Sequence, residues 1–289
     1  MRFSLILATL GRAEEVRRFL DSLAAQADQE FELIVVDQNP DDRLAEPLAA
    51  FAERLPVIHI RLPAPGVSHA RNRGLAVARG DIIGFPDDDC VYPPGLLAAV
   101  AEQLAPKQGA DDRPADAVVA RILDLETDRN ALPYCGHDRA GELDIKGAYD
   151  LGLTPALFCR AAAVAEHRFD ERLGPGAGTR WRSGEDIDYL MRLVAQGARV
   201  RYCPDLIVRH PSPHEVYGFR KLLAREFHCG RANGLITGRH IGLGALGAEA
   251  LPNLWYVLLN LVLGRPKDAA YLGVYSAGLV LGQLDRLRA

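Results

Sequence analysis

The sequence predicts an α/β fold built on a mostly parallel sheet, followed by a helical C-terminal region. In the first hundred residues, short apolar segments alternate with amphipathic ones, which is typical of consecutive strand–helix units. The apolar segments contain few polar positions, as expected for parallel strands that helices cover on both faces. Residues 206–289 have a net charge of +5, whereas residues 1–205 have a net charge of −9. The tail therefore differs physically from the rest of the chain.

Four strand–helix units are predicted in order along the first part of the chain. Each strand is a short apolar run bounded by turn residues, and each helix has apolar residues at helical spacing, such as Val16, Phe19, Leu20 and Leu23. Ser68 follows a Pro–Gly turn and is expected to cap the third helix. The strands span Phe3–Ala8, Phe31–Asp37, Val57–Leu62 and Asp81–Pro86, and the helices span Arg12–Gln26, Leu44–Leu55, Ser68–Ala78 and Pro93–Leu104.

The regular alternation weakens after the fourth unit. A polar loop is expected from Pro106 to Pro114, and the segment Glu126–Asp150 is expected to be irregular. Residues 174–178 are rich in glycine and are expected to be flexible. The remaining predicted elements are a helix over Glu185–Gln196 and strands over Ala117–Leu125, Pro155–Arg160, Val200–Tyr202 and Leu206–His210.

The composition excludes several classes of protein. With 289 residues, of which 48% are hydrophobic and 25% charged, the chain resembles an ordinary globular protein. A net charge of −4 argues against a general nucleic-acid binder. The first apolar segment is better explained as a buried strand than as a signal peptide, and we expect a cytoplasmic protein with reduced thiols. The five cysteines have no zinc-site spacing; they are Cys90, Cys135, Cys159, Cys203 and Cys229.

Carboxylates occur at three chain reversals of the predicted scaffold. Asp37 ends the second strand, Asp87–Asp89 follow the fourth strand, and Glu185–Asp186 open a helix after the glycine-rich segment. Neighbouring ionised carboxylates repel one another and imply a countercharge. Mg²⁺ or Mn²⁺ prefers such oxygen ligands, and Mg²⁺ commonly bridges them to substrate phosphates. Because ligands of open α/β sheets bind at the carboxyl ends of the strands, the three positions together favour a metal-dependent site.

Each of these positions also has a purely structural explanation. The Pro–Asp–Asp–Asp turn can cap the helix that follows it, and Asp37 can cap a strand end. Glu185–Asp186 can offset the dipole of the helix they begin. His210 lies between a predicted strand and Pro211; it is either structural or part of a metal or diphosphate site.

Five segments, taken in their order and spacing, define a recognisable pattern. They are Phe3–Thr9 followed by Arg12, Leu33–Asp37, Gly66–Leu75, Gly80–Asp89 followed by Pro94 and Leu96–Leu97, and Gly184–Leu193. This pattern resembles the inverting nucleotide-sugar glycosyltransferases of family 2, which have the GT-A fold. The resemblance extends over roughly residues 2–210.

The resemblance implies a donor-binding role for six residues. Thr9 and Asp37 would line the nucleoside pocket, with Asp37 accepting hydrogen bonds from the base or the ribose. Arg71 would lie near the nucleotide, although it could instead pair with a surface carboxylate. Asp87 would face the ribose. The complete donor-binding set is Thr9, Arg12, Asp37, Arg71, Asp87 and Asp88.

The same resemblance implies a metal-dependent reaction that inverts the anomeric centre. Asp89 would bind Mg²⁺ or Mn²⁺ at the donor diphosphate, and His210 would join that site. The metal would offset the charge that develops on the departing diphosphate. Asp186 would be the general base that removes a proton from an acceptor hydroxyl. Glu185 would orient the acceptor or only cap its helix.

The resemblance also implies a domain organisation and classes of substrate. Residues 1–210 would form the GT-A domain, with a nucleotide-sugar half in 1–105 and an acceptor half in 106–210, and residues 211–289 would form a helical appendage. The donor would be a nucleoside-diphosphate sugar, with UDP expected first and GDP or dTDP open. The acceptor would be a carbohydrate or a lipid-linked molecule of cell-surface polysaccharide or glycolipid synthesis. The Gln-x-x-Arg-Trp signature of processive synthases is absent, which favours addition of one sugar per encounter.

Two apolar segments of the tail, residues 254–263 and 269–284, are each shorter than the ~20 residues of a membrane-spanning helix. With aromatic and basic flanks they fit an interfacial anchor at the inner face of the cell membrane. A helical pair packed against the catalytic domain or a second subunit explains the same pattern.

Rival functions explain parts of the pattern. A sugar-1-phosphate nucleotidyltransferase also uses a metal and a nucleotide, but it has a glycine-rich basic loop after the first strand. Residues 8–15 contain one glycine and two acids instead. A non-catalytic sugar- or lipid-binding scaffold of the same fold would not need both Asp89 and Asp186. A nicotinamide dehydrogenase is disfavoured because no GxGxxG follows a predicted strand.

Overall fold

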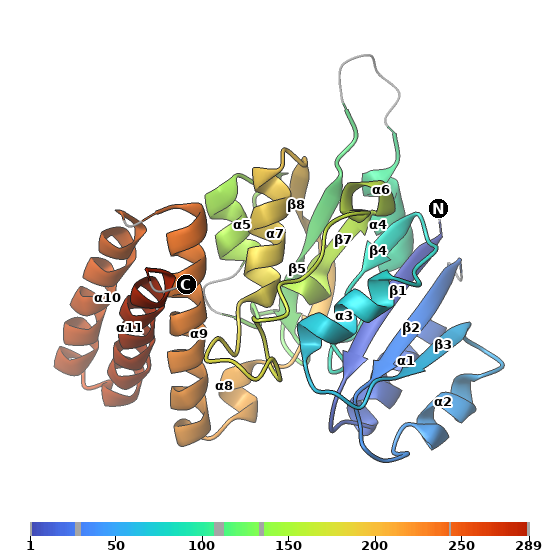
Figure 1. The fold of residues 1–289 in the computed structure, drawn as a ribbon, viewed down its shortest axis with the longest axis horizontal. Helices are drawn as coiled ribbons and strands as arrows, with labels where there is room; N and C mark the ends of the chain where they lie inside the picture. The colour runs from blue at the N-terminus through green and yellow to red at the C-terminus, as the bar shows by residue number, and fades with distance from the viewer. Residues whose placement is uncertain (1, 27–29, 107–112, 133–135, 243, 288–289) are drawn as a thin grey trace.

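The computed structural model describes residues 2–26, 30–106, 113–132, 136–242 and 244–287. Within these residues one mixed sheet is flanked by helices, and further helices lie at one end (Figure 1), so the predicted α/β fold is confirmed. The strands are β1 Phe3–Thr9, β2 Phe31–Asp37, β3 Val57–Arg61, β4 Ile82–Gly84, β5 Ala117–Asp124, β6 Gly141–Glu142, β7 Leu157–Arg160 and β8 Val200–His210. Across the sheet their order is β3-β2-β1-β4-β7-β5-β8-β6.

The half of the sheet formed by the first four strands is parallel, as predicted. β1 pairs with β2 and β4, and β2 pairs with β3, so that Thr9 lies opposite Asp37 in register. Because parallel strands share a carboxyl edge, the loops after β1, β2 and β4 meet at that edge. Asp87, in the loop after β4, forms an isolated parallel bridge with Ala8.

The other half of the sheet contains two antiparallel strands, of which β7 lies within the predicted strand Pro155–Arg160 and β6 was not predicted. β7 runs antiparallel to both β4 and β5, and β6 runs antiparallel to β8. The amino end of β7, preceded by the short 3₁₀ turn Thr154–Ala156, therefore lies beside the carboxyl end of β4. β8 is one strand rather than two short ones, because a shift in its register with β5 accommodates the irregularity.

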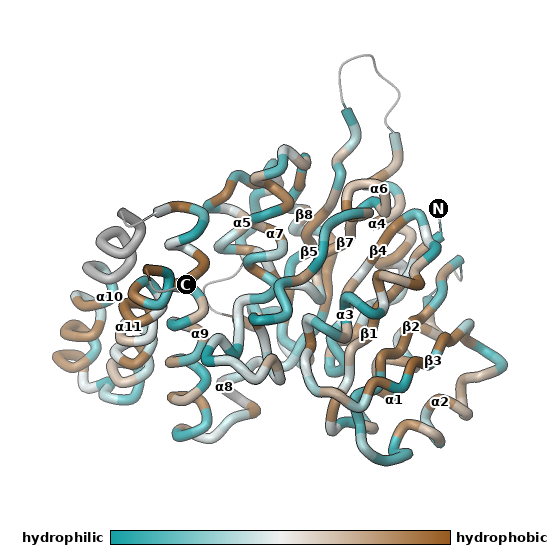
Figure 2. Tube along the Cα trace, in the orientation of Figure 1, coloured by the Kyte–Doolittle hydropathy of each residue, from teal (hydrophilic) through white to brown (hydrophobic). Residues whose placement is uncertain are grey.

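Helices cover the sheet, and the buried face of the first one consists of the predicted Val16, Phe19, Leu20 and Leu23. Every residue of β2 is buried, and most residues along the inner strands β1 and β2 are hydrophobic (Figure 2). The helices are α1 Glu14–Ala24, α2 Ala45–Phe51, α3 Val67–Leu75, α4 Leu96–Leu104, α5 Ile145–Leu151, α6 Ala161–Val164, α7 Glu185–Ala195, α8 Pro213–Val216, α9 Phe219–His240, α10 Gly244–Val262 and α11 Pro266–Arg286.

Two local predictions are wrong. Gly66 occupies the N-cap position of α3, and Ser68 lies inside the first turn, where its hydroxyl donates to the carbonyl of Leu173 at 2.8 Å. The segment that was expected to be irregular contains α5. Its N-cap Asp144 accepts a hydrogen bond from the backbone N–H of Gly147 at 2.7 Å. In the first case a tertiary partner competes for the hydroxyl, and in the second a local cap defines a short helix without strong periodicity.

Four of the five cysteines, Cys90, Cys159, Cys203 and Cys229, are free thiols. The fifth, Cys135, lies outside the described residues, as do residues 107–112 of the predicted polar loop.

The helices α9, α10 and α11 pack side by side at the end of the molecule away from β3 (Figure 1). Glycines allow α9 and α11 to approach closely, because a Cβ at Gly230 or Gly234 would collide with the backbone of α11 at Tyr275 or Leu279. In the part of the chain that the structure describes, no helix has the length and the apolar character that crossing a bilayer would require.

Candidate active site

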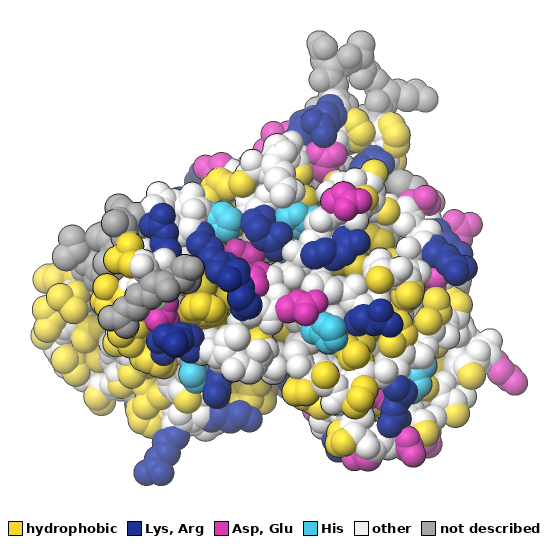
Figure 3. Space-filling model, viewed as in Figure 1, with side chains coloured by type: hydrophobic (Ala, Val, Ile, Leu, Met, Phe, Trp, Pro, Cys, Tyr) yellow, Lys and Arg dark blue, Asp and Glu magenta, His cyan; other side chains and the backbone are white. Residues whose placement is uncertain are grey.

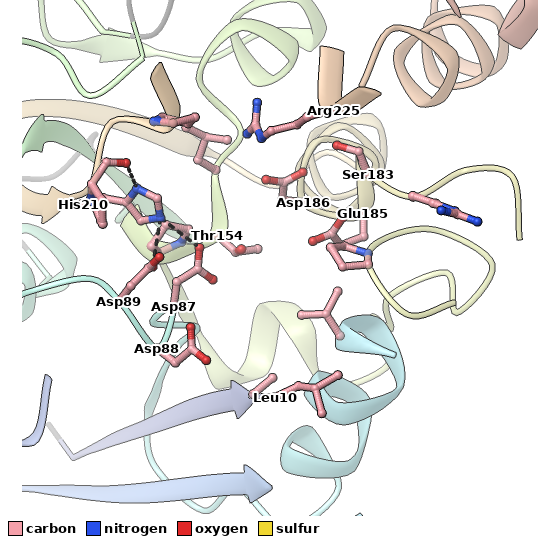
Figure 4. A pocket seen from close by; sticks show the side chains of 18 of the residues that line it. Leu10, Asp87, Asp88, Asp89, Thr154, Ser183, Glu185, Asp186, His210 and Arg225 are labelled. Atoms are coloured by element: carbon pink, nitrogen blue, oxygen red, sulfur yellow. Dashed lines mark hydrogen bonds and ion pairs between the residues drawn. The ribbon is translucent and has the colours of Figure 1, made fainter. Parts of the chain in front are cut away.

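A cavity of about 550 Å³ opens at the carboxyl edge of the parallel strands. It is bounded by the loops after β1, β2 and β4, by the end of β8, by the start of α7 and by one face of α9. Two backbone bridges fix the acidic loop in this place, since Asp87 pairs with Ala8 of β1 and Val91 pairs with Arg209 of β8. Figure 4 shows Asp87, Asp89 and His210 on one side of the cavity and Glu185, Asp186 and Ser183 on another.

Asp87, Asp89 and His210 form a cluster that can hold a metal ion. One ligand atom from each residue lies within 4.8 Å of the other two. Nε2 of His210 is 3.2 Å from Asp89 Oδ1 and 3.6 Å from Asp87 Oδ2. Its Nδ1 lies 2.8 Å from the carbonyl oxygen of Pro211 and donates to it, because a carbonyl only accepts. In the neutral form of the ring, Nε2 would therefore point its lone pair toward the carboxylates, an arrangement typical of a metal-ligating histidine.

The donor set of this cluster fits the metals expected from the sequence. Carboxylate oxygens suit Mg²⁺ and Mn²⁺, and an imidazole nitrogen is a ligand that divalent transition metals accept readily. Burial alone would lower the pKa of His210, but hydrogen bonds to Asp87 and Asp89 outweigh it and raise that pKa to about 10. Burial alone would raise the pKa of Asp89, but the bond to His210 and the charge of Arg12 lower it to about 2. A bound cation would thus replace the imidazolium proton as the countercharge of the carboxylates.

Asp88 points away from this cluster and fastens the acidic loop. Its carboxylate accepts hydrogen bonds from Thr9 Oγ1 at 2.7 Å and from Arg12 Nη1 at 2.6 Å. Arg12 also contacts Asp89 at 2.5 Å and lines the cavity, whereas Thr9 is buried beneath it. Burial raises the pKa of Asp88 to about 6 in spite of Arg12. Thr9 and Arg12 therefore hold the loop that presents Asp87 and Asp89.

Arg71 connects the acidic loop to the helix that follows the glycine-rich segment. Its guanidinium is almost fully buried and donates to Asp87 at 2.8 Å and to Glu185 at 3.1 Å. The guanidinium carbon lies 5.4 Å from the ring centre of Phe169, a cation–π distance. The carboxylates it pairs with belong to the cavity, so the alternative of a surface pairing is wrong.

Asp186 and Glu185 begin α7 at the cavity. The preceding Gly184 has a φ of +81°, which a residue with a Cβ rarely adopts. Burial raises the pKa of Glu185, which Arg71 partly counters. Burial and the charge of Glu185 raise the pKa of Asp186 to about 7. Asp186 is partly exposed and lines the cavity, so it is a carboxylate that can accept a proton near neutral pH.

Asp37 lies apart from the cavity lining. Its buried carboxylate accepts hydrogen bonds from the backbone N–H and side-chain amide of Asn39 at 2.9 and 2.7 Å, and its other oxygen is 3.0 Å from His59 Nε2. These contacts shape the turn after β2, and the next residue, Gln38, reaches the cavity. A direct role of Asp37 in nucleoside binding stays a prediction.

Part of the cavity wall was not identified from the sequence. Lys221 and Arg225 of α9 line it, together with the 3₁₀ turn before β7 and the glycine-rich segment at Pro175 and Gly176. The spacing of Lys221 and Arg225 by four residues was the available signal, because it places both on one helix face. Their position at the cavity depends on how α9 packs.

Comparisons with known proteins place the chain among glycosyltransferases. Residues 4–130 match the model of the family described as glycosyl transferase family 2. The chain is 37% identical over 205 residues to a PGL/p-HBAD biosynthesis glycosyltransferase of Mycobacterium bovis, which covers 68% of this chain and 72% of that protein. It spans only about a quarter to a third of the length of other curated relatives that it matches.

Two solved structures have the same fold. A mannosyltransferase, PcManGT from Pyrobaculum calidifontis in complex with GDP-Man and Mn²⁺, superposes with a TM-score of 0.63 at 16% identity and covers 99% of this chain and 87% of that one. S. aureus TarS 1–349 in complex with UDP-GlcNAc superposes with a TM-score of 0.59 at 17% identity, covering 99% of this chain and 93% of that one. At these identities the likeness concerns the fold.

Proposed function

The chain belongs to glycosyl transferase family 2 and has its GT-A fold, and from that membership we propose that it is a metal-dependent, inverting glycosyltransferase. It moves one sugar from a nucleoside-diphosphate sugar to an acceptor hydroxyl. The observation that supports this best is the pairing of two sites across one cavity, the Asp87–Asp89–His210 cluster and the partly exposed Asp186.

The residues of the cavity suit a single displacement at the anomeric carbon. Asp87, Asp89 and His210 would hold Mg²⁺ or Mn²⁺, and the bound ion would neutralise charge on the departing diphosphate. Asp186 removes the proton of the acceptor hydroxyl, and its raised pKa makes it a stronger base than an ordinary aspartate. Arg71 donates hydrogen bonds to Glu185 and Asp87. It thereby fixes α7, which presents Asp186, relative to the acidic loop that presents Asp87 and Asp89. A single displacement inverts the configuration and needs no enzyme nucleophile.

The donor half of the chain is assigned to residues 1–105 and the acceptor half to residues 106–210, with the helices after residue 210 as an appendage. UDP is the first nucleotide to test, followed by GDP and dTDP. TarS 1–349 was solved with UDP-GlcNAc and PcManGT with GDP-Man and Mn²⁺, and these complexes support the choice of both nucleotides and of manganese. Binding of the nucleoside is assigned to Asp37, Gln38 and the end of β1.

A carbohydrate or lipid-linked acceptor of cell-surface polysaccharide or glycolipid synthesis is the proposed second substrate. The Mycobacterium bovis relative is named for PGL/p-HBAD biosynthesis, which supports a role in building a glycoconjugate. The absence of the processive signature supports transfer of one sugar at a time.

We further assign the tail a peripheral contact with the inner face of the cell membrane. Large apolar side chains of α10 and the turn after it are exposed, including Leu254, Trp255, Leu258 and Leu261. Hydrophobic side chains gather over the α10 end of the molecule in the space-filling view (Figure 3). An amphipathic helix with aromatic residues and nearby cations binds at the boundary of headgroups and acyl chains. A second copy of the chain is the other occupant that this surface could accept.

Release of nucleoside diphosphate tests the function directly. We expect turnover of at least one nucleotide sugar among UDP, GDP and dTDP donors with Mn²⁺ or Mg²⁺, and its loss with a chelator. Pyrophosphate release from a nucleoside triphosphate and a sugar 1-phosphate would instead support the nucleotidyltransferase alternative. If the protein binds a donor but shows no turnover with every cell extract added as a source of acceptors, the result would support the non-catalytic scaffold.

A further inference from the structure

One part of the cavity wall is basic. Lys221, Arg225 and His228 of α9 line the cavity, and so does Arg182 from the segment that leads into α7. Lys221 and Arg225 are four residues apart and His228 follows three residues later, so all three share one face of the helix. Lys and Arg side chains gather over α9 in the space-filling view (Figure 3), and Figure 4 shows Arg225 in the cavity near Asp186. We refer to these four residues as the basic wall.

The cations of the basic wall have little compensating charge. Among the residues that the structure describes, no carboxylate lies within ion-pair distance of Arg182 or Lys221. The ammonium of Lys221 instead lies 4.4 Å from the ring centre of Tyr217. Within the described part of the chain, the carboxylate in ion-pair contact with Arg225 is that of the neighbouring Glu226, at 3.2 Å.

The other two arginines that line the cavity, Arg12 and Arg71, are each paired with two carboxylates. Arg12 contacts two carboxylates of the acidic loop, and Arg71 bridges Asp87 and Glu185. Positive charge on their side of the cavity is therefore already matched by negative charge. The basic wall is where the cavity has cations in excess.

His228 adds an unused polar atom to the basic wall. Its Nδ1 is buried and has no hydrogen-bond partner among the described residues. Burial and the charges of Arg182 and Arg231 lower the pKa of His228, whereas a hydrogen bond from its ring to the backbone of Arg180 acts in the opposite direction. Because the other ring nitrogen donates that bond, Nδ1 of the neutral ring is an acceptor, which a hydroxyl of a bound molecule can satisfy. A buried polar atom without a partner is costly and is commonly satisfied by a ligand or a water.

The basic wall is fixed next to the proposed base. α9 packs directly on the start of α7, because a Cβ at Gly184 would lie 2.5 Å from Ile236 of α9. One residue earlier, Ser183 Oγ is 3.4 Å from Cys229 Sγ of α9. Both contacts involve the two residues that precede Glu185–Asp186. A group bound to the wall is thus held in a set position relative to Asp186.

We propose that the basic wall binds a phosphate group of the acceptor and thereby places the acceptor hydroxyl at Asp186. This inference rests on the proposed function, whose acceptor it assigns to phosphate-bearing molecules. Cations that outnumber the carboxylates around them in a cavity attract an anion, and guanidinium and ammonium donors match phosphate oxygens. The phosphate of a lipid headgroup and that of a free polyol phosphate present the same chemistry to the wall.

The donor diphosphate is the competing anion for these cations. It is expected at the Asp87–Asp89–His210 cluster. If the basic wall served the donor, loss of its cations would weaken nucleoside-diphosphate binding. If it serves the acceptor, nucleoside-diphosphate binding stays unchanged and only the binding of the phosphate ester weakens.

The experiment therefore measures both ligands on the same full-length proteins. sn-Glycerol 1-phosphate is titrated by ligand-observed NMR, with glycerol as the uncharged probe. Phosphatidic acid in phosphatidylcholine vesicles provides the lipid arm. UDP with Mn²⁺ is titrated by calorimetry. Lys221→Ala/Arg225→Ala is compared with Lys146→Ala/Arg172→Ala, which removes the same charge from exposed positions outside the cavity lining.

We expect the Lys221→Ala/Arg225→Ala variant to bind the phosphate ester, free or in vesicles, roughly tenfold more weakly than the unmodified protein. In the control variant the affinity for the phosphate ester should change by no more than about twofold. Glycerol should not bind measurably to the unmodified protein or to either variant. UDP affinity and the thermal midpoint should stay unchanged.

Equal weakening in the control, or unchanged phosphate binding in both arms, overturns the proposal. Loss of UDP affinity at an unchanged thermal midpoint assigns the wall to the donor instead. If the unmodified protein binds no nucleoside diphosphate, the glycosyltransferase proposal fails, while the phosphate-ester arm still decides the role of the wall.

Discussion

Arg71 and Glu185 are 114 positions apart in the chain and form a buried ion pair of 3.1 Å in the cavity wall. The second nitrogen of the same guanidinium donates to Asp87 at 2.8 Å. One arginine on α3 therefore joins the loop that presents the candidate metal ligands to the helix that presents the candidate base. Loss of this side chain would affect both.

Arg71→Met should destabilise the fold by about 3 kcal/mol or more, because it leaves two carboxylates without their buried countercharge. Arg172→Met removes a largely exposed arginine that pairs with Asp170, and it should cost no more than about 1 kcal/mol. Urea unfolding of both variants gives the comparison. Equal stability of the two variants would show that Arg71 is not the link described above.

Asp89→Ala should abolish the Mn²⁺-dependent part of nucleoside-diphosphate binding and leave the fold intact, since it removes one of three ligands of the candidate metal site. Calorimetric titration of UDP and of GDP, with and without Mn²⁺, measures this. Asp138→Ala, at an exposed carboxylate outside the cavity, is the control. Affinity in Asp89→Ala that equals the control in both conditions would contradict the assignment.

Asp186→Asn keeps the shape of the side chain and removes its ability to take a proton. Turnover should fall by roughly 10²-fold or more, while donor binding persists. The anomeric configuration of the product, read by NMR, should be inverted in the unmodified enzyme. Near-normal turnover of the variant, or retention of configuration, is incompatible with Asp186 as the base of a single displacement.

The pH dependence of kcat should report Asp186. A base works in its deprotonated form, and burial and Glu185 raise its pKa to about 7. The active fraction is therefore nearly complete above pH 8 and is lost as the pH falls through 7, with kcat decreasing about tenfold per pH unit below it. The measurement is made at saturating Mn²⁺ and donor. A flat profile between pH 5.5 and 8 would argue against this carboxylate as the base.

Replacing Trp255 and Leu258 by serine should weaken binding to anionic vesicles without loss of stability, because both side chains are exposed on α10. Vesicle flotation of the two proteins provides the test, and a chain ending near His240 should not float. If the full chain stays off the vesicles and instead forms dimers that the double substitution separates, the surface is an interface between copies.

The residue types of the candidate site and the sheet edge where most of them lie could be predicted from the sequence. Apolar runs of strand length that end in carboxylates identify an α/β sheet edge, because parallel strands must bring their carboxyl ends together. That reasoning brought Asp37 and Asp87–Asp89 to one edge, and Asp186 was expected to join them from the start of a helix. The structure lines one cavity with Asp87, Asp89 and Asp186, but not with Asp37. The parallel pairing of β1 with β2 and β4 follows the same logic.

Only the tertiary structure decided which partner each polar group has. Asp88 accepts hydrogen bonds from Thr9 and Arg12, whereas Asp87 and Asp89 face His210, because residues 87–90 form a turn that directs successive side chains differently. The position of His210 beside the acidic loop depends on the pairing of β8 with β5, which is non-local. The basic wall depends on a close contact of α9 with α7 through Gly184. Local sequence patterns follow from the periodicity of helices and strands. These contacts instead depend on side-chain packing between segments up to about 120 residues apart, which no local pattern encodes.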